Sequence, residues 1–474
     1  MTLPVPAAEV PATEAQAALR DDSAATATLR EHLRATILLA IPLILGQLSS
    51  IGMNVIDTLL AGHLNAHTLA AVAVGAGVWA LAIVTAIGVM MAVPPTVAQL
   101  AGAGARERIG PVFRQSLWLA LMLGIVLLLG VRYGGPRLLT AFGVDTDIIA
   151  DTGSFLRAIA WGAPALTIYF ALRGLSEGLA LTRPTMYFGL FGLVLLAPLG
   201  YALMYGRFGF AARGAQGSGI ATATVLWVQM GAFALYLHLR ARYRDIGPFA
   251  RFERPHWGEI GALLRLGVPM GVAVLMECAL FVCTALLIAS LGAVTVASHQ
   301  VAINVASVTF MLPLGLAMAT TVRVGHAAGR GDAAGVRRAG LVGISLSLAT
   351  QVLSASVMAL FPLAIAHAYT DDADVVALAA QLLVLAAIFQ FSDGIQVTAN
   401  GALRGMKDTT VPMLITLVAY WLIGMPVGYW LAFHHHFGAR GMWMGLAAGL
   451  TAAAGLLLLR FLKVSRRALP PQEA

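Results

Sequence analysis

The sequence predicts an all-α integral membrane protein with twelve transmembrane helices in two parallel six-helix bundles that form a V-shaped central cavity. The first observation is composition: only 11% of the 474 residues are charged, against roughly 25% in an average soluble protein. The second is a mean hydropathy of +0.83. This much apolar surface must face lipid, because one buried core cannot absorb it. The third is a repeat that relates the two halves of the chain.

Twelve apolar segments are long enough to span a bilayer, which takes about 20 residues. Their predicted cores are 36–62, 68–93, 112–131, 153–172, 184–206, 217–239, 262–290, 295–320, 338–361, 376–400, 410–433 and 441–462. These spans predict an N-lobe bundle over 33–239 and a C-lobe bundle over 259–463, joined by a cytoplasmic linker, 240–258. Residues 1–32 predict a flexible cytoplasmic tail and not a signal peptide, and 464–474 predict a second cytoplasmic tail.

Basic residues fall mainly on one side of the predicted membrane. When the connecting segments are assigned alternately to two sides, all but six of the 30 Lys and Arg residues share a side with the two tails. The six exceptions are Arg132, Arg137, Arg157, Arg207, Arg213 and Arg440. Cytoplasmic loops carry the excess of Lys and Arg. We therefore expect a multi-pass protein of the bacterial inner membrane with both termini in the cytoplasm.

Several function classes are excluded by what the chain lacks. Its two lysines, Lys407 and Lys463, are not followed by Ser or Thr, so no P-loop can hold a nucleotide. Cys278 and Cys283 form no CxxC motif and predict neither a disulfide framework nor a zinc site. The net charge of +8 lies in short clusters between apolar runs, which argues against nucleic acid as a partner.

The two halves repeat at a displacement of 227 to 231 residues. Pro42 corresponds to Pro269, and Ala171-Leu172-Arg173-Gly174 recurs as Ala402-Leu403-Arg404-Gly405. Thr96-Val97 matches Thr321-Val322 after a two-residue slip. Six spans in each half is an even number, so both halves enter the membrane from the same face and form parallel repeats. Two such bundles can rock against each other, which predicts alternating access.

Three acidic residues are predicted inside spans: Asp57, Glu277 and Asp393. A charge in mid-bilayer costs about 2.5–3.5 kcal/mol even on the lenient insertion scale, so each is expected to face a cavity, a partner or an ion. No basic residue is predicted at comparable depth. We therefore expect an interior that binds cations, whether protons, sodium ions or cationic organic molecules.

Polar residues at helical spacing accompany these acids. Gln47, Ser50 and Asn54 share a face with Asp57; Gln300, Asn304, Ser307 and Met311 share another; Gln390, Asp393 and Asn400 share a third. The predicted substrate-cavity residues are Gln47, Asn54, Gln300, Asn304, Met311, Phe389 and Gln390. Interhelical hydrogen bonding is the alternative for each uncharged member, because Asn, Gln and Ser commonly join helices in membranes.

Other polar residues and small-residue motifs favour structural roles. His299 lies near a span end, where a packed, hydrogen-bonded histidine is expected rather than a proton carrier. Three adjacent loop histidines, His434 to His436, predict no metal site. Gly441, Gly445 and Gly449 form overlapping GxxxG patterns, expected to pack inside the protein rather than between copies.

Several motifs together resemble the multidrug and toxic compound extrusion (MATE) family, NorM-like branch, over nearly the whole chain after residue 33. They are Asp57-Thr58 through Ala61-Gly62, Pro95 to Leu100, His299 to Asn304, Phe310 to Pro313, Arg323 to His326 and Gly401 to Gly405. The resemblance implies export of cationic, partly hydrophobic compounds in exchange for sodium ions or protons. It implies that Glu277 and Asp393 match the C-lobe coupling-ion carboxylates and Asp57 the N-lobe acid.

The chain departs from the family pattern at three positions. Leu196 and Gly200 stand where N-lobe relatives carry asparagines, and Phe389 stands where many carry tyrosine. The C-lobe acid pair is intact.

A mechanism also follows from the residues alone. Carboxylates in a cavity of low dielectric constant favour neutralisation, and a proton, a sodium ion or an organic cation can each supply it, so these ligands exclude one another. We expect no cofactor other than the transported ion, and a monomer in contact with membrane lipid. A flippase for a lipid-linked precursor, a membrane-embedded enzyme and a channel are the alternatives; the enzyme lacks a nucleophile, metal or phosphate motif beside the acids.

Overall fold

The computed structural model describes residues 29–141 and 146–466, and all regular structure in these ranges is helical. Twelve helices are long and apolar enough to cross a membrane, as predicted. The protein is therefore a multi-pass membrane protein. Most of the expected tail 1–32, and residues 467–474 of the second tail, lie outside the described residues.

The N-lobe contains the first six spans. The first is α2 (Leu29–Leu64), and the second is α3 (Ala66–Met90) with α4 (Val93–Gly102). The third comprises α5 (Arg106–Leu129), η2 (Gly130–Gly134) and α6 (Gly135–Ala141). The fourth comprises α7 (Thr146–Ile159), η3 (Ala160–Gly162) and α8 (Ala163–Gly178). The last two are α9 (Arg183–Tyr205) and α10 (Gly214–Leu239).

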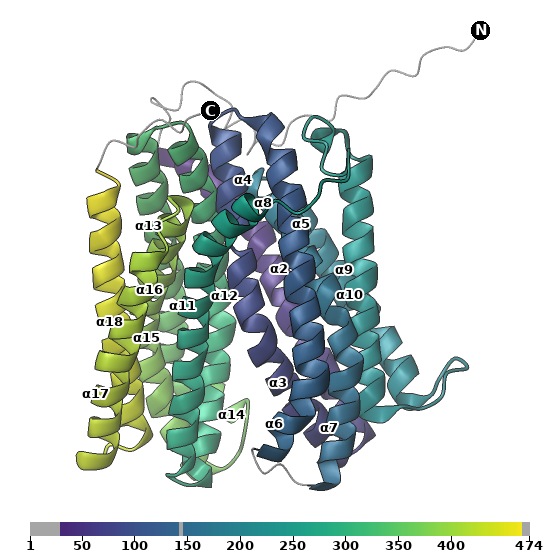
Figure 1. Cartoon of the computed structure of the whole chain (residues 1–474). Helices are drawn as coiled ribbons and strands as arrows, with labels where there is room; N and C mark the ends of the chain where they lie inside the picture. The colour runs from purple at the N-terminus through teal and green to yellow at the C-terminus, as the bar shows by residue number, and fades with distance from the viewer. Residues whose placement is uncertain (1–28, 142–145, 467–474) are drawn as a thin grey trace.

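The C-lobe contains the other six spans. They begin with α11 (Trp257–Ala289), α12 (Ala293–Gly329) and α13 (Ala333–Leu360), and a short α14 (Pro362–His367) precedes α15 (Ala373–Gly405). The eleventh span comprises α16 (Thr410–Leu417), η5 (Val418–Gly424), α17 (Met425–Tyr429) and η6 (Trp430–His434). The twelfth span is α18 (Ala439–Val464). Figure 1 shows the C-lobe on the left and the N-lobe on the right.

Helix α2 begins at Leu29, inside the segment expected to be a flexible tail, so that expectation is wrong for residues 29–32. The reason is a contact with the other lobe. Arg323 of α12 donates from Nη1 to the His32 carbonyl oxygen at 2.8 Å and to the Thr36 hydroxyl at 2.5 Å. Its Nη2 lies 2.6 Å from Nδ1 of His32. A buried guanidinium that needs acceptors thus holds the first turn of α2 in place.

The segment between the lobes is attached to α5. It includes the short helix η4 (Ala241–Tyr243) and runs to the start of α11 at Trp257. Arg114 donates to the Gly247 carbonyl oxygen at 2.7 Å and to Glu253 at 2.5 Å, and this hydrogen bond lowers the pKa of Glu253 below its ordinary value. Trp118 donates to the Glu253 carbonyl oxygen at 2.8 Å. The linker therefore lies against the N-lobe rather than free of it.

The two lobes meet at the end where α2 begins and α18 ends, which we call the basic end. There α2 packs against α12, α3 against α11, and α4 against α12. The approach is close enough for backbones to touch: a Cβ on Gly88 would lie 2.3 Å from Cα of Gly271, and one on Gly267 would lie 2.3 Å from the Val89 carbonyl oxygen. Glycine is needed at such positions because any side chain would separate the helices.

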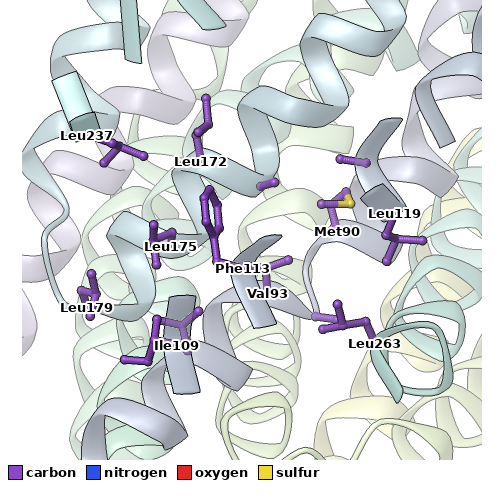
Figure 2. Close-up of a cluster of buried hydrophobic side chains, with 14 of the residues drawn as sticks. Met90, Val93, Ile109, Phe113, Leu119, Leu172, Leu175, Leu179, Leu237 and Leu263 are labelled. Atoms are coloured by element: carbon purple, nitrogen blue, oxygen red, sulfur yellow. The ribbon is translucent and has the colours of Figure 1, made fainter. Parts of the chain in front are cut away.

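A buried apolar cluster fills the basic end. Figure 2 shows it: Met90 and Val93 from the second span pack with Phe113 of α5 and Leu175 of α8, and Leu263 of α11 joins them. Since Leu263 belongs to the C-lobe, the core of the N-lobe continues across the interface. Hydrophobic burial therefore stabilises this closed end.

Two buried hydrogen bonds join the lobes at the basic end, and a pseudo-two-fold axis relates one bond to the other. Gln99 donates from Nε2 to the Gly405 carbonyl oxygen at 2.8 Å, and His326 lies with Nε2 2.9 Å from the Gly178 carbonyl oxygen. Adding 227 to Gln99 gives His326, and adding 227 to Gly178 gives Gly405. We call this pair the inter-lobe clasp.

The clasp corrects the predicted alignment of the halves. Gly178 packs against Pro94 and Val97, whereas Gly405 packs against Thr321 and Val324, again 227 residues apart. Residues with positive φ, Ala180 (61°) and Lys407 (59°), follow the two helix ends at the same displacement. The repeat is confirmed, but the match of 171–174 with 402–405 is wrong by one helical turn. A shift of four residues, about one helical turn, leaves small residues on the same face of the helix. The sequence alone therefore does not reveal that the two segments are misaligned. The match of Thr96-Val97 with Thr321-Val322 is wrong by two residues, because Val97 corresponds to Val324.

The glycine motif of the last span packs internally, as expected. A Cβ on Gly445 would lie 2.2 Å from Cα of Gly428, and one on Gly441 would lie 2.5 Å from the Ala432 nitrogen. Helix α18 thus lies directly against the eleventh span.

Candidate functional site

Two of the predicted acids come together inside the C-lobe. Glu277 projects from α11 and Asp393 from α15, and their carboxylates are close enough to interact electrostatically. Asp393 is 4% exposed, and its Oδ1 is buried without a hydrogen-bond partner. Neither acid has an ion-pair partner within 4.0 Å in the described part of the chain. Asp393 is buried and Glu277 half-buried, and two mutually repelling carboxylates in such a place form a site that a cation would stabilise.

Tyr420 belongs to this site and was not predicted from the sequence. It is fully buried, its hydroxyl has no partner, and it interacts electrostatically with both acids. It lies in η5, a π-helical segment, and such segments are frequent at functional sites. One signal was available: a tyrosine in the middle of a span departs from the usual position of Tyr at the membrane interfaces.

Arg404 corrects the expectation that no basic residue lies near the acids. It is buried in the last turn of α15 and interacts electrostatically with Glu277, without forming an ion pair. Its Nη1 lies 3.7 Å from Sδ of Met91 in the N-lobe, and its Nε has no partner. The sequence placed Arg404 in a loop because the helix was expected to end at 400. The helix continues to Gly405 and carries the guanidinium inward.

Asp57 has its own partners in the N-lobe. Ser218 and Thr222 of α10 donate to its two carboxylate oxygens at 2.9 and 3.0 Å. Leu196 and Gly200 supply no hydrogen bond from their side chains: Leu196 is fully buried, and a Cβ on Gly200 would lie 2.8 Å from Leu60. Two hydroxyls one helical turn apart satisfy the carboxylate instead.

Several predicted cavity residues lie on exposed parts of the two helices that join the lobes. Asn54 of α2 and Gln300 and Asn304 of α12 are exposed, and Gln300 donates to Asn304 at 3.1 Å. Gln47 and Met311 are half-buried, and Gln47 accepts from Arg173 at 3.0 Å. Asn54, Gln300 and Asn304 lie in the halves of α2 and α12 that are farther from the basic end.

Phe389 and Gln390 lie apart from that exposed set. Phe389 is buried between Phe281 and Trp443, with ring centroids 6.3 and 5.7 Å away. Gln390 is fully bonded: Nε2 donates to Thr309 at 2.7 Å, and Oε1 accepts from Ser354 at 2.5 Å. Gln390 thus joins three C-lobe helices, which is the interhelical role left open for it.

The sequence interpretation also missed an acid that is buried, Glu177. Glu177 of α8 is 2% exposed and forms an ion pair with Arg173, four residues earlier. Thr185 also donates to Glu177, at 3.2 Å, and Arg173 lies 3.6 Å from Sδ of Met318 in the C-lobe. The i, i+4 spacing of opposite charges was a usable signal. It was overlooked because the span was expected to end at 172.

His299 takes the structural position expected of it. His299 is buried, and its Nδ1 accepts a hydrogen bond from Nε1 of Trp443 at 3.2 Å. His435 packs against Trp430, with ring centroids 4.3 Å apart. Cys278 and Cys283 are half-buried free thiols.

Two helical repeats with carboxylates buried inside one of them define a class of protein, a polytopic membrane transporter. Comparison with known families agrees. The MatE family model matches residues 42–202 and again 269–430, one match in each lobe. The chain belongs to the MatE family, and it is a transporter rather than an enzyme.

Similar proteins cover almost the whole chain. A "Probable multidrug resistance protein NorM" of Xanthomonas campestris pv. campestris is 51% identical over 94% of this chain and 96% of its own length. "Multidrug resistance protein PmpM" of Pseudomonas aeruginosa is 41% identical, with 93% of each chain covered. A solved structure described as the outward-facing conformation of a multidrug resistance MATE family transporter superposes with a TM-score of 0.86 at 21% identity, covering 96% of this chain and 98% of that one.

Proposed function

We propose that this protein exports cationic, partly hydrophobic compounds across the bacterial inner membrane in exchange for sodium ions or protons. The names of the relatives, multidrug resistance proteins, support efflux of drugs. The proposal of cation exchange is supported chiefly by one observation: Glu277 and Asp393 interact inside the C-lobe, and within residues 29–141 and 146–466 neither forms an ion pair. A site of this kind is stabilised by an incoming cation and discriminates weakly among cations.

The coupling ion and the organic cation compete for the same negative charge. When the small ion enters from outside, driven by about 2.3 kcal/mol per charge per 100 mV of membrane potential, it neutralises the pair. The organic cation then loses its electrostatic partner and leaves. Tyr420 would contribute its free hydroxyl as an uncharged ligand to the small ion, beside the two carboxylates.

The arrangement of the lobes supports alternating access. The basic end is closed by backbone contacts, apolar packing and the inter-lobe clasp. Both termini would lie in the cytoplasm, so that this end is the cytoplasmic one. The conformation then opens outward, where the small ion loads. A flippase for anionic lipid-linked precursors would need cationic side chains in excess at the site, but Arg173 is paired with Glu177, and Arg404 interacts electrostatically with Glu277, one of two acids there.

Ethidium efflux from cells tests the carboxylate pair. Glu277→Gln and Asp393→Asn should each lower the initial efflux rate at least ten-fold, because each removes the charge that both cations need. Glu107→Gln is the matched control, since Glu107 is exposed in the first turn of α5 at the basic end. Undiminished efflux in both site variants, at equal protein levels, would contradict the assignment.

Proteoliposomes test the exchange. At least one of two gradients, a sodium gradient alone or a pH gradient alone, should start efflux by the wild-type protein. The Asp393→Asn variant should show no efflux under the same gradient. If neither gradient drives efflux by the wild-type protein, ion exchange is not its energy source.

A further inference from the structure

A cavity outside the central site combines basic and aromatic side chains on the N-lobe. It has a volume of about 420 Å³ and lies between η2, the α7–η3 junction and α10. Arg132 and Arg157 line it together with Trp161 and Trp227, while Gln216 and Ile220 line its side along α10. None of these residues takes part in the transport site described above.

The two arginines are available to an anion. Neither guanidinium has an ion-pair partner in residues 29–141 and 146–466. Arg132 is held by aromatic rings instead, 5.7 Å from the ring of Trp161 and 5.8 Å from that of Tyr133. Cation–π contacts of this kind orient a guanidinium without neutralising it. The cavity therefore presents positive charge that the protein leaves uncompensated.

These two arginines lie at the end of the protein where the distribution of Lys and Arg in membrane proteins predicts few basic residues. Arg132 and Arg157 are two of only six basic residues at the end opposite the basic end, and they share one cavity. Figure 1 shows α6 and α7 at the lower end of the molecule, and α10 on the side of the N-lobe away from the C-lobe. The cavity thus belongs to the membrane-facing side and not to the interface between the lobes.

The lining also suits the boundary between headgroups and hydrocarbon. Trp161 and Trp227 are 55% and 43% exposed, and Nε1 of Trp227 donates to the Trp161 carbonyl oxygen at 2.9 Å. Tryptophan favours this boundary. From Gln216 to Trp227 the lining follows α10 for about 16 Å, at 1.5 Å per residue. That length accommodates a headgroup and the first part of an acyl chain.

We propose that this cavity binds the phosphate headgroup of an anionic phospholipid, with its acyl chain along Ile220 and Trp227. Arginine suits phosphate because its planar fork donates two parallel hydrogen bonds. Basic pockets between membrane helices bind anionic lipid headgroups on the cytoplasmic side of membranes, and this cavity would be such a pocket at the opposite end. Charge complementarity favours an anionic lipid over a zwitterionic one.

Native mass spectrometry of the full chain in detergent tests the proposal. The wild-type protein should retain dioleoyl-phosphatidylglycerol at least ten-fold more tightly than dioleoyl-phosphatidylcholine. The double variant Arg132→Gln/Arg157→Gln should lose this preference. The matched control, Arg137→Gln/Arg440→Gln, removes the same charge from the same end outside the cavity and should stay within two-fold of the wild type.

Three results would overturn the proposal. The first is no preference for phosphatidylglycerol in the wild-type protein, a result that does not depend on how any variant folds. The second is an equal loss of preference in both double variants, which would mean a general effect of charge. The third is full displacement of the lipid by millimolar inorganic phosphate, which would assign the cavity to a soluble anion.

Discussion

At the level of single residues, the surroundings of each buried acid distinguish its role. Glu177 is neutralised by Arg173, and Asp57 receives two hydroxyl hydrogen bonds. Asp393 keeps one carboxylate oxygen without any partner. Burial of a charge is costly unless something compensates for it. The uncompensated acid is thus the one suited to exchange ligands.

The Arg173–Glu177 pair gives a stability prediction. Glu177→Gln and Arg173→Met should each destabilise the protein by about 3–5 kcal/mol, because each leaves the other charge buried and unpaired. The double variant Arg173→Met/Glu177→Met should recover most of this loss. Thermal unfolding in detergent measures the effect. If the single variants have the same melting temperature as the wild type, the Arg173–Glu177 pair is solvated.

At the level of helices, close packing of glycines determines which faces can meet. Pro42, Pro198, Pro269 and Pro313 lie inside continuous helices. Pro164 and Pro426 lie in the first turns of α8 and α17, directly after the helical segments η3 and η5. The eleventh span alternates between α- and π-helix around Tyr420. Such irregular segments are tolerated in a membrane because neighbouring helices shield them.

Two glycines of α18 should respond differently to the same substitution. Gly445→Ala should destabilise the protein by about 1–3 kcal/mol, because the new methyl group overlaps the backbone of α17. Gly455→Ala is the matched control, since no atom lies within 4 Å of its Cβ position. It should leave the melting temperature equal or slightly higher, because alanine favours helix more than glycine does. Equal losses in both variants would contradict the packing described here.

At the level of the whole molecule, the lobes are joined through a few symmetric contacts at the basic end. The inter-lobe clasp, Gln99 with Gly405 and His326 with Gly178, lies beside the close glycine contacts. A duplicated chain produces such contacts in pairs, because each half meets the other through the same surface. Opening this end must break both hydrogen bonds.

The clasp predicts a shift in conformation. Gln99→Ala/His326→Ala should broaden and lengthen the distance between spin labels at Glu107→Cys and Ala334→Cys, one exposed position on each lobe. Cys278 and Cys283 would first be replaced. Gln351→Ala is the control, because it removes a buried hydrogen bond within the C-lobe, from α13 to the Gln390 carbonyl oxygen. If the distance distribution is the same as in the labelled protein with Gln99 and His326 intact, the clasp does not hold the lobes together at this end.

Much of this architecture was predictable from the order of residues along the chain. Hydropathy predicted twelve spans, and the spacing of Pro42 and Pro269 predicted a duplication, because both signals depend on local composition and on displacement alone. Glu277 and Asp393 were found in the same way, since a carboxylate inside an apolar run is conspicuous. Both acids could be found without knowing which residues surround them in the folded protein.

The contacts between distant residues needed the folded chain. Helix ends lay several residues beyond the apolar cores, so Glu177 and Arg404 were assigned to loops although both are buried. Tyr420 meets Asp393 and Glu277 only through the packing of three spans. The clasp joins residues some 150 and 300 positions apart. Such proximity arises from how whole helices pack, and helical periodicity reports only which side of its own helix a residue occupies.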